Sequence, residues 1–399
     1  MNRRRFVQQF GMGTLAATAA HPVSLRAAEG LAEPGVSLAS TPMTLQAPRP
    51  DGVEAVWGVR ARALGRIEWE GPDGARGVAA SDAHGFVPQG TRSVRVRIDG
   101  WIPGREYRLR PVTVAAEGES RVETGDWRTF RTLDPAAPAT RFAVWNDTHV
   151  NQTTLERLDE VTPASDFLIW NGDTCNDWHR EDDLVPILLN PGGRDITRNR
   201  PLHVVWGNHD VRGPWAFRVP DVVASPSGRP FHAFRSGPLA AVCLHTGEDK
   251  PDDHPSFRGR VAFDPLRQEQ AAWLNDVLRR PEFASAPYRL VFCHIPLRWI
   301  DERPQDYAGT GFDRHSGRSR AAWHDALVRW GVQAIISGHT HRAAWMPPTD
   351  VFPYGQLIGG GPQPASATWI EGVANPQSLR LTVRNLAGDI LHDVSLPAL

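Results

Sequence analysis

The first third of the chain alternates hydrophobic and polar residues with a period of two. Val94, Val96 and Ile98 alternate with charged residues, so one face of a strand would be buried and the other exposed. The sequence Gly71-Pro72-Asp73-Gly74 is a strong turn signal between two further strand candidates. Because no long helical pattern interrupts this alternation, residues 42–133 are predicted to form a small all-β domain.

A segment rich in Pro and Ala, residues 134–140, predicts a linker of limited flexibility. Beyond it, short apolar runs alternate with helical candidates at residues 268–280 and 319–330, which is typical of an α/β domain. The tail has apolar runs at residues 378–383 and 390–396 and predicts a closing β-hairpin. The pattern therefore predicts a second domain of the α/β class over residues 141–399.

Five apolar runs of the α/β part end in residues that can bind a metal ion, several of them just after a glycine. The polar residues that follow these runs are Asp147 and His149, Asp173, Asn208 with His209 and Asp210, His294, and His339 with His341. Strands of an α/β sheet present their carboxyl ends to one crevice, so these side chains would converge on one site. Glycine allows the backbone to turn sharply there.

The ligand set predicted at this site combines imidazole, carboxylate and amide groups, which suits Zn, Mn or Fe(II). It lacks the thiolates expected of a structural zinc site. The seven candidate ligands are Asp147, His149, Asp173, Asn208, His294, His339 and His341. Seven ligands exceed the needs of one ion, so we expect two divalent ions that share a carboxylate, about 3.5 to 4 Å apart, with a bridging hydroxide.

The five motifs, in this order, resemble those of the calcineurin-like metallophosphoesterase superfamily. The resemblance implies a four-layer α-β-β-α fold, in which two β-sheets pack face to face between helices. It implies that Asp147, His149 and His341 bind the first metal, that Asn208, His294 and His339 bind the second, and that Asp173 bridges them. The implied reaction is hydrolysis of a phosphate ester by attack of the metal-bridging hydroxide.

Three more residues near these motifs are predicted to act on the substrate. In the superfamily the His of the Gly-Asn-His motif faces the substrate, so His209 is expected to stabilise the phosphoryl group or to protonate the leaving oxygen. We expect Asp210 to orient His209, because a carboxylate fixes the imidazole tautomer and raises its basicity. Arg212 could bind a phosphate oxygen through the N–H donors of its guanidinium group. The sequence is equally compatible with an arginine that lies in a loop and is solvated.

The N-terminal part resembles a fibronectin type III sandwich like that of purple-acid-phosphatase-like enzymes. The resemblance rests on Val56-Trp57 and on the segments 101–107 and 127–132. The metal motifs depart from those enzymes, because His149 is present and Asn176 stands where a tyrosine would bind Fe(III). Two divalent ions are therefore the expected cofactor. His245 occupies a place where relatives often carry Asp, which suggests a structural difference nearby.

Composition narrows the expected partners. Lys and Arg (44) balance Asp and Glu (45), so the overall charge indicates neither nucleic acid nor an anionic membrane as a partner. The three cysteines, Cys175, Cys243 and Cys293, lie in or just after apolar runs and are expected to be buried without a disulfide framework. Six histidines outside the motifs are expected to be surface or core residues: His179, His203, His232, His245, His254 and His315.

The N-terminus contains Arg3-Arg4-Arg5-Phe6-Val7, followed by a weakly apolar stretch that reaches Ala20. This arrangement resembles a twin-arginine signal, so residues 1–28 are predicted to be a signal peptide read by the twin-arginine export machinery. The apolar stretch is too short and too polar for stable membrane insertion. The expected location is periplasmic or secreted, and a disordered basic N-terminus is the alternative.

The leading hypothesis is an exported phosphoesterase with a binuclear metal centre that hydrolyses small phosphate mono- or diesters. The choice between the two depends on loops 176–200 and 210–238, whose shape the sequence leaves open. The alternative is a non-catalytic secreted binding protein that retains the fold. The complete ligand set and His209 argue against it.

Overall fold

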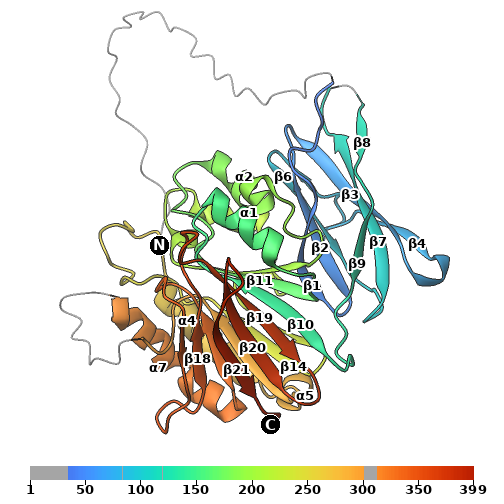
Figure 1. The fold of residues 1–399 in the computed structure, drawn as a ribbon. Coiled ribbons are helices and arrows are strands. Elements are labelled where there is room, and N and C mark those ends of the chain that lie inside the picture. Colours follow the sequence, from blue (N-terminus) through green and yellow to red (C-terminus); the bar gives the residue numbers. More distant parts are fainter. Residues whose placement is uncertain (1–34, 83, 119, 301–311) are drawn as a thin grey trace, which may run out of the picture.

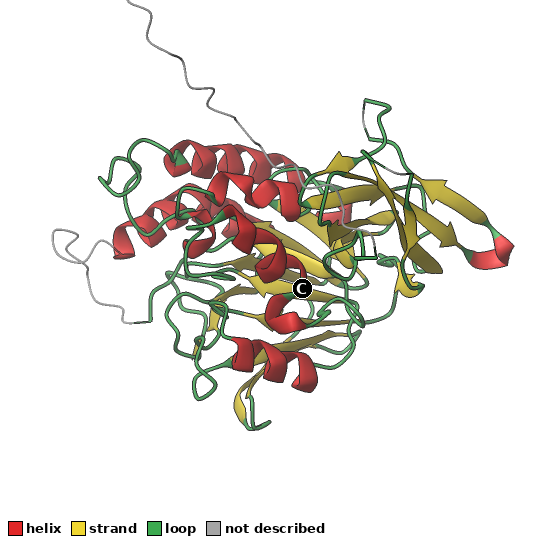
Figure 2. Ribbon diagram, turned by 90° about the horizontal axis from the view of Figure 1, so that it is seen from above, coloured by secondary structure: helices red, strands yellow, loops and turns green. Residues whose placement is uncertain are grey.

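The computed structural model describes residues 35–82, 84–118, 120–300 and 312–399, which form three β-sheets with helices on two outer faces (Figures 1 and 2). The predicted signal peptide, residues 1–28, lies outside the described residues. No helix within the described ranges is long and apolar enough to cross a membrane.

The largest sheet has nine strands and includes segments from both parts of the chain. In spatial order they are β21 (Ile390–Leu396), β20 (Leu379–Asn385), β19 (Thr368–Ala374), β10 (Thr140–Trp145), β11 (Phe167–Asn171), β12 (Leu202–Val205), β1 (Thr44–Arg49), β2 (Gly52–Gly58) and β6 (Ser93–Ile98). Strands β10, β11 and β12 are parallel, with Trp145 opposite Trp170 and Asn171 opposite Val205. Their carboxyl ends therefore lie at one edge of the sheet. The predicted C-terminal hairpin is confirmed, because β20 and β21 pair in antiparallel fashion.

A second sheet of six strands packs face to face against β10, β11 and β12. Its spatial order is β13 (His232–Ser236), β14 (Leu239–Leu244), β15 (Tyr288–Cys293), β16 (Ala334–Ser337), β18 (Gly355–Ile358) and β17 (Ala344–Met346). Strands β14, β15, β16 and β18 are parallel to one another, whereas the edge strands β13 and β17 are antiparallel to β14 and β18. The core between the sheets includes Phe142, Phe167 and Phe292, all fully buried. This contact fixes the strand ends of one sheet relative to those of the other.

Helices cover the outer face of each sheet. The first helical layer lies on the nine-stranded sheet and contains α1 (Gln152–Val161), α2 (Leu184–Leu189) and α3 (Val219–Val222). The second layer lies on the six-stranded sheet and contains α4 (Phe263–Val277), α5 (Pro281–Ala284) and α7 (Phe312–Trp330). Short 3₁₀ turns are η1 (Pro72–Gly74), η2 (Glu181–Asp183), η3 (Pro191–Gly193), η4 (His209–Val211) and η5 (Ala216–Arg218). The predicted helices at residues 268–280 and 319–330 correspond to α4 and α7, each of which begins earlier than predicted.

The N-terminal part is all-β, as the alternating pattern predicts, and its strands lie in two packed sheets. Strands β1, β2 and β6 pack on a third sheet of β4 (Arg76–Ala79), β3 (Ala63–Glu70), β7 (Glu106–Ala115) and β8 (Val122–Thr124), to which β5 (Gln89–Gly90) and β9 (Arg128–Arg131) are added. Val94, Val96 and Ile98 are buried, and Arg95 and Arg97 between them are exposed. The predicted turn at residues 71–74 contains η1 and connects β3 to β4.

One pairing was not predicted from the sequence. Strand β1 runs parallel to β12, with Gln46 opposite Leu202. Without β1, strand β12 would be an edge strand with unpaired backbone groups. The N-terminal sheet pair therefore completes the large sheet rather than only preceding it.

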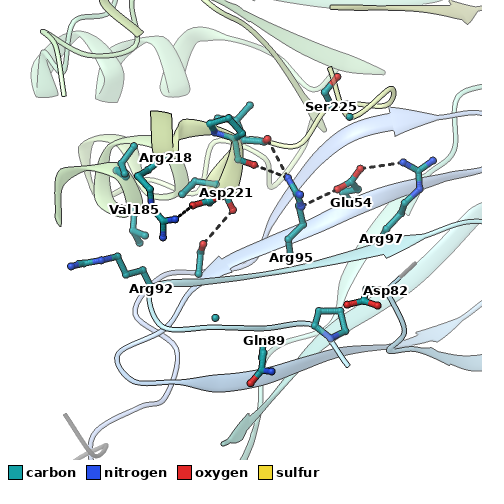
Figure 3. Close-up of a pocket in the computed structure, with 18 of the residues that line it drawn as sticks. Glu54, Asp82, Gln89, Arg92, Arg95, Arg97, Val185, Arg218, Asp221 and Ser225 are labelled. Atoms are coloured by element: carbon teal, nitrogen blue, oxygen red, sulfur yellow. Dashed lines mark hydrogen bonds and ion pairs between the residues drawn. The ribbon is translucent and has the colours of Figure 1, made fainter. Parts of the chain in front are cut away.

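Hydrogen bonds of Arg95 fasten the N-terminal sheets to the first helical layer (Figure 3). Arg95 on β6 donates hydrogen bonds to the carbonyl oxygens of Pro220 (3.0 Å) and Val223 (3.4 Å), at and just after α3. The same side chain lies 3.4 Å from the buried carboxylate of Glu54. These contacts line a cavity of about 780 Å³ between the two parts of the chain. Because the arginines of this cavity bind acids or carbonyls, it offers little free positive charge.

The three cysteines are buried and free, as predicted. Two of the histidines outside the motifs, His203 on β12 and His232 on β13, form a buried pair that joins the two large sheets. Their Nδ1 and Nε2 atoms are 3.1 Å apart, and the His203 ring stacks on Phe234. Burial lowers the pKa of His232 to about 3, and burial with the neighbouring ring lowers the pKa of His203 well below its usual range. Both rings are therefore neutral in the folded protein.

This pair predicts a loss of stability in mild acid. Unfolded histidine takes up a proton near pH 6.5, whereas the folded rings stay neutral, so the free energy of unfolding falls as pH decreases below 6.5. Between pH 7 and pH 5, each such histidine should cost about 2 kcal/mol. Urea unfolding in chelator-containing buffer should show that this pH-dependent loss is about 2 kcal/mol smaller in His232→Gln than in the wild type. The exposed His179→Gln is the control, and equal losses in His232→Gln and the wild type would contradict the prediction.

Candidate metal centre

The carboxyl ends of five parallel strands place the predicted ligands at one edge of the two packed sheets. Asp147 and His149 follow β10, Asp173 follows β11, Asn208 follows β12, His294 follows β15, and His339 with His341 follows β16. The inter-sheet core brings the ends of β15 and β16 next to those of β10 to β12. The structure thus brings together all seven residues that the sequence singles out as ligands.

The ligand atoms form two groups that share one residue. The first group is Asp147, His149, Asp173 and His341, and the second is Asp173, His294 and His339. Within each group, one ligand atom per residue lies within 4.8 Å of the others. The Oδ1 atom of Asn208 lies 2.8 Å from Nδ1 of His339, which puts this amide next to the second group. Asp173 is the only residue common to both groups.

The backbone at these positions is unusual. Five of the seven residues, namely Asp147, His149, Asp173, His339 and His341, have φ between 44° and 69°. Residues other than glycine rarely adopt this left-handed conformation, and it concentrates at functional sites because the surrounding structure must impose it. A Cβ atom at Gly338 would collide with the Asp147 carboxylate. The glycine before His339 is therefore required for close approach of two loops.

Hydrogen bonds orient two of the histidines toward the centre of the site. His294 uses Nδ1 to donate to the carbonyl oxygen of Asn171 (2.9 Å), and His149 uses Nδ1 to donate to Oδ1 of Asn176 (2.8 Å). In each ring this engages Nδ1 and leaves Nε2 as the nitrogen that a metal ion could bind in place of a proton. Both Nε2 atoms are buried and have no hydrogen-bond partner among the described residues. Two buried lone pairs that face carboxylates fit a bound cation.

The charges of the site also fit a cation. Burial would lower the pKa of His149 and His294, yet Asp173 and Asp147 outweigh it and raise both, the pKa of His294 to about 10. Burial acts against the charged form of Asp173, but His294 and His149 hold the pKa of its carboxyl well below the usual range. The two carboxylates therefore create a buried negative potential that favours positive charge, which divalent ions would supply.

The structure corrects the partner predicted for His209. Nδ1 of His209 lies 2.6 Å from Oδ1 of Asp177, and Nε2 lies 3.2 Å from Nη1 of Arg212. Asp210, the predicted orienting residue, is buried and accepts hydrogen bonds from Thr174 and from the backbone N–H of Gly207 (2.7 Å). Asp210 therefore holds the loops after β11 and β12 together, and the carboxylate that contacts the His209 ring is that of Asp177.

The predicted phosphate clamp at Arg212 is also revised. Its Nε and Nη2 atoms bind the carboxylates of Glu248 and Asp249. These carboxylates raise the pKa of Arg212 and occupy most of its fork of donors. Only Nη1 faces the site, where it donates to Nε2 of His209. Arg212 is thus neither a solvated loop residue nor a free bidentate clamp.

Sequence reasoning missed Asp177, Glu248 and Asp249 as neighbours of the site. Asp177 lies four residues after Asp173 in the same loop, which was the available signal. Glu248 and Asp249 follow β14, a parallel strand whose end carried no predicted ligand. The other histidines outside the motifs stay apart from both ligand groups where the structure describes them. His179 is exposed, His254 binds Ser256, and His245 is buried against Trp206 and Phe263, whereas the side chain of His315 lies outside the described part.

Comparisons with known proteins agree with this arrangement. Among curated proteins, the Homo sapiens protein named serine/threonine-protein phosphatase CPPED1 is 30% identical over 172 residues, which are 42% of this chain and 49% of that protein. The Pongo abelii protein of the same name is 28% identical over 172 residues, with the same coverage. The chain thus spans about half the length of the curated relatives it matches.

Two solved structures have a similar fold. The purple acid phosphatase PPD1 from yellow lupin (Lupinus luteus) seeds has a TM-score of 0.64 and 12% identity, over 89% of this chain and 74% of that chain. The structure of PhoD has a TM-score of 0.56 and 12% identity, over 89% of this chain and 92% of that chain. At this identity the likeness shows the fold alone. Residues 140–343, more than half of the chain, match the family model for calcineurin-like phosphoesterases, and the chain therefore belongs to this family of phosphate-ester hydrolases.

Proposed function

We propose that the protein hydrolyses phosphate mono- or diesters with two divalent metal ions, one in each ligand group. The observation that carries this proposal is the position of Asp173, whose carboxylate belongs to both groups. Asp147, His149 and His341 would complete the first site, and Asn208, His294 and His339 the second. Mn, Zn and Fe(II) match this donor set. Two ions there would lower the pKa of a shared water and neutralise the phosphate oxygens.

His209 is proposed to act on the leaving oxygen or the phosphoryl group. Because a carboxylate only accepts and a guanidinium only donates, the contacts with Asp177 and Arg212 place the ring proton on Nδ1 and leave Nε2 as the acceptor. When a phosphate arrives, Nη1 of Arg212 can donate to a phosphate oxygen instead. Nε2 is then free to carry a proton to the leaving group, while Asp177 stabilises the imidazolium.

The N-terminal sheet pair is proposed to be a fibronectin type III-like domain that supports the site. Its strand β1 pairs with β12, which leads directly into Asn208 and His209. Export through the twin-arginine machinery to a periplasmic or extracellular location also remains a proposal. It rests on the sequence of residues 1–28.

An ester panel tests the proposed reaction. Protein treated with chelator and then reloaded with Mn, Zn or Fe(II) is assayed against matched aryl phosphate monoesters and diesters. A phosphoserine peptide is included because the human relative is named a serine/threonine-protein phosphatase. We expect hydrolysis with at least one ion and its loss on renewed chelation. If no ester is cleaved with any ion, the enzymatic proposal is wrong and the non-catalytic alternative is favoured.

Metal content tests the shared ligand. Asp173→Asn removes the carboxylate common to both groups and should abolish most binding of both ions, whereas His341→Ala removes a ligand of one group and should lower the content to about half. Elemental analysis of the dialysed protein measures ions per chain. The exposed Asp350→Asn should keep the wild-type content. Retention of two ions by Asp173→Asn would show that Asp173 is not a bridge.

Turnover tests the pair formed by Asp177 and His209. His209→Ala should lower kcat roughly hundredfold or more with unchanged metal content. Asp177→Asn should lower kcat by about ten- to a hundredfold, because the ring loses its orienting acceptor. The double variant should be no slower than His209→Ala, because Asp177 is proposed to act only through the His209 ring, which His209→Ala already removes. Asp350→Asn is again the control. If the losses in kcat of the two single variants add in the double variant, Asp177 does not act through His209.

A further inference from the structure

A second cavity, of about 1030 Å³, opens beside the metal centre. Two of its lining residues, Asp177 and Arg212, are the residues that contact the two ring nitrogens of His209. The cavity therefore begins at the side chain proposed to act on the leaving oxygen. If the phosphate of an ester lies at the metal centre, the part of the ester bound in this cavity would be joined to the phosphate on the side that faces His209.

The walls of this cavity are largely apolar. Trp206, Phe217, Phe257, Phe263, Val211 and Leu266 line it, from the loop after β12, from η4 and η5, and from α4 with the loop before it. His245 lies between Trp206 and Phe263, with ring centroids 5.6 and 5.7 Å away. Burial lowers the pKa of His245 to about 3, so this wall carries no charge at neutral pH.

The charged residues at the cavity are already partnered. Arg212 binds Glu248 and Asp249, Lys250 lies 2.6 Å from Asp249, and Glu269 lies 2.8 Å from Arg229. Arg260 donates to the carbonyl oxygens of Phe257 (2.9 Å) and Ser256 (3.1 Å). A second phosphate or another strongly anionic group would have to break these contacts. The cavity is therefore suited to an uncharged group.

Phe217 is the most informative wall residue. Its side chain is 69% exposed, and it lines the same cavity as Asp177 and Arg212. It stacks on Trp215 with ring centroids 6.0 Å apart, so a second aromatic ring supports this wall from outside the lining. An exposed aromatic surface next to a polar site is a common mark of ligand recognition.

We infer that this cavity binds a bulky apolar leaving group, so that the preferred substrates are phosphate esters of aryl or similarly large apolar alcohols. The inference rests on the proposed function and names its substrate class. In the reaction, a water oxygen bonds to phosphorus and releases a proton to solvent, and the bond from phosphorus to the alcohol oxygen breaks. Nε2 of His209, once Arg212 has turned to the phosphate, takes up a proton from solvent and gives it to the alcohol oxygen. The released alcohol lies in the cavity and the phosphate stays at the metal centre.

Two esters with similar chemical reactivity but different size test this inference. Phenyl phosphate and 2-naphthyl phosphate have leaving groups of similar acidity, so a difference in KM reports on binding of the larger ring. We expect KM for naphthyl phosphate to be on the order of tenfold lower. Phe217→Ala should raise KM for naphthyl phosphate roughly fivefold, leave kcat nearly unchanged and affect phenyl phosphate less. Phe217→Leu should recover part of the loss.

The matched control is Phe86→Ala, which makes the same substitution at a residue that is 67% exposed in the loop between β4 and β5. It should behave as the wild type with both esters. Equal KM values for the two esters, or equal effects of Phe217→Ala and Phe86→Ala, would overturn the inference while leaving the proposed hydrolysis intact.

A binding measurement keeps the two proposals distinguishable. Calorimetry on metal-loaded protein compares 2-naphthylphosphonate with methylphosphonate, neither of which contains an ester bond. Tighter binding of the naphthyl compound, weakened by Phe217→Ala, supports the apolar site even if no ester is cleaved. Equal binding of the two phosphonates refutes it.

Discussion

The buried carboxylate of Asp173 is the group on which the rest of the site depends. Its Oδ2 atom lies 3.4 Å from Nε2 of His149 and 3.2 Å from Nε2 of His294, and its Oδ1 atom accepts the backbone N–H of His209 at 2.9 Å. Its carbonyl oxygen accepts the N–H of His149 at 3.0 Å. One residue thus connects the loops after β10, β11, β12 and β15. A buried charge of this kind is tolerated only when positive charge and hydrogen bonds surround it.

The packed sheets supply the rigidity that this arrangement requires. The backbone of Asp173 and of four other predicted ligands is left-handed, which costs energy at each residue. The aromatic core between the sheets, with Phe142 stacked on Phe167 and edge-on to Phe292, holds the strands whose ends carry these loops. Burial of the aromatic core between the sheets therefore offsets the backbone strain of the loops above it.

The N-terminal sheets contribute to the same rigidity from the other side. Strand β1 covers the edge of β12, and Arg95 binds carbonyl oxygens at α3, which packs on the same sheet. The loop after β12 carries Asn208 and His209 at one end and leads to η5 with Phe217. The metal centre, the apolar cavity and the N-terminal sheets are consequently connected through one short stretch of chain.

The sequence by itself determined the elements of secondary structure and the chemistry at their ends. The alternation at Val94, Val96 and Ile98, the helices near α4 and α7, and the ligands at five strand ends follow from local periodicity and residue type, which one sequence contains. His149 and Asn176 could also be recognised as departures from the purple acid phosphatase pattern.

Only the tertiary structure decided which side chains meet. Asp177 rather than Asp210 partners His209, and Glu248 with Asp249 holds Arg212, because three loops converge at the edge of two sheets. The pairing of β1 with β12 joins residues more than 150 positions apart. Such contacts depend on the packing of whole layers, and periodicity and spacing along the chain carry no information about them.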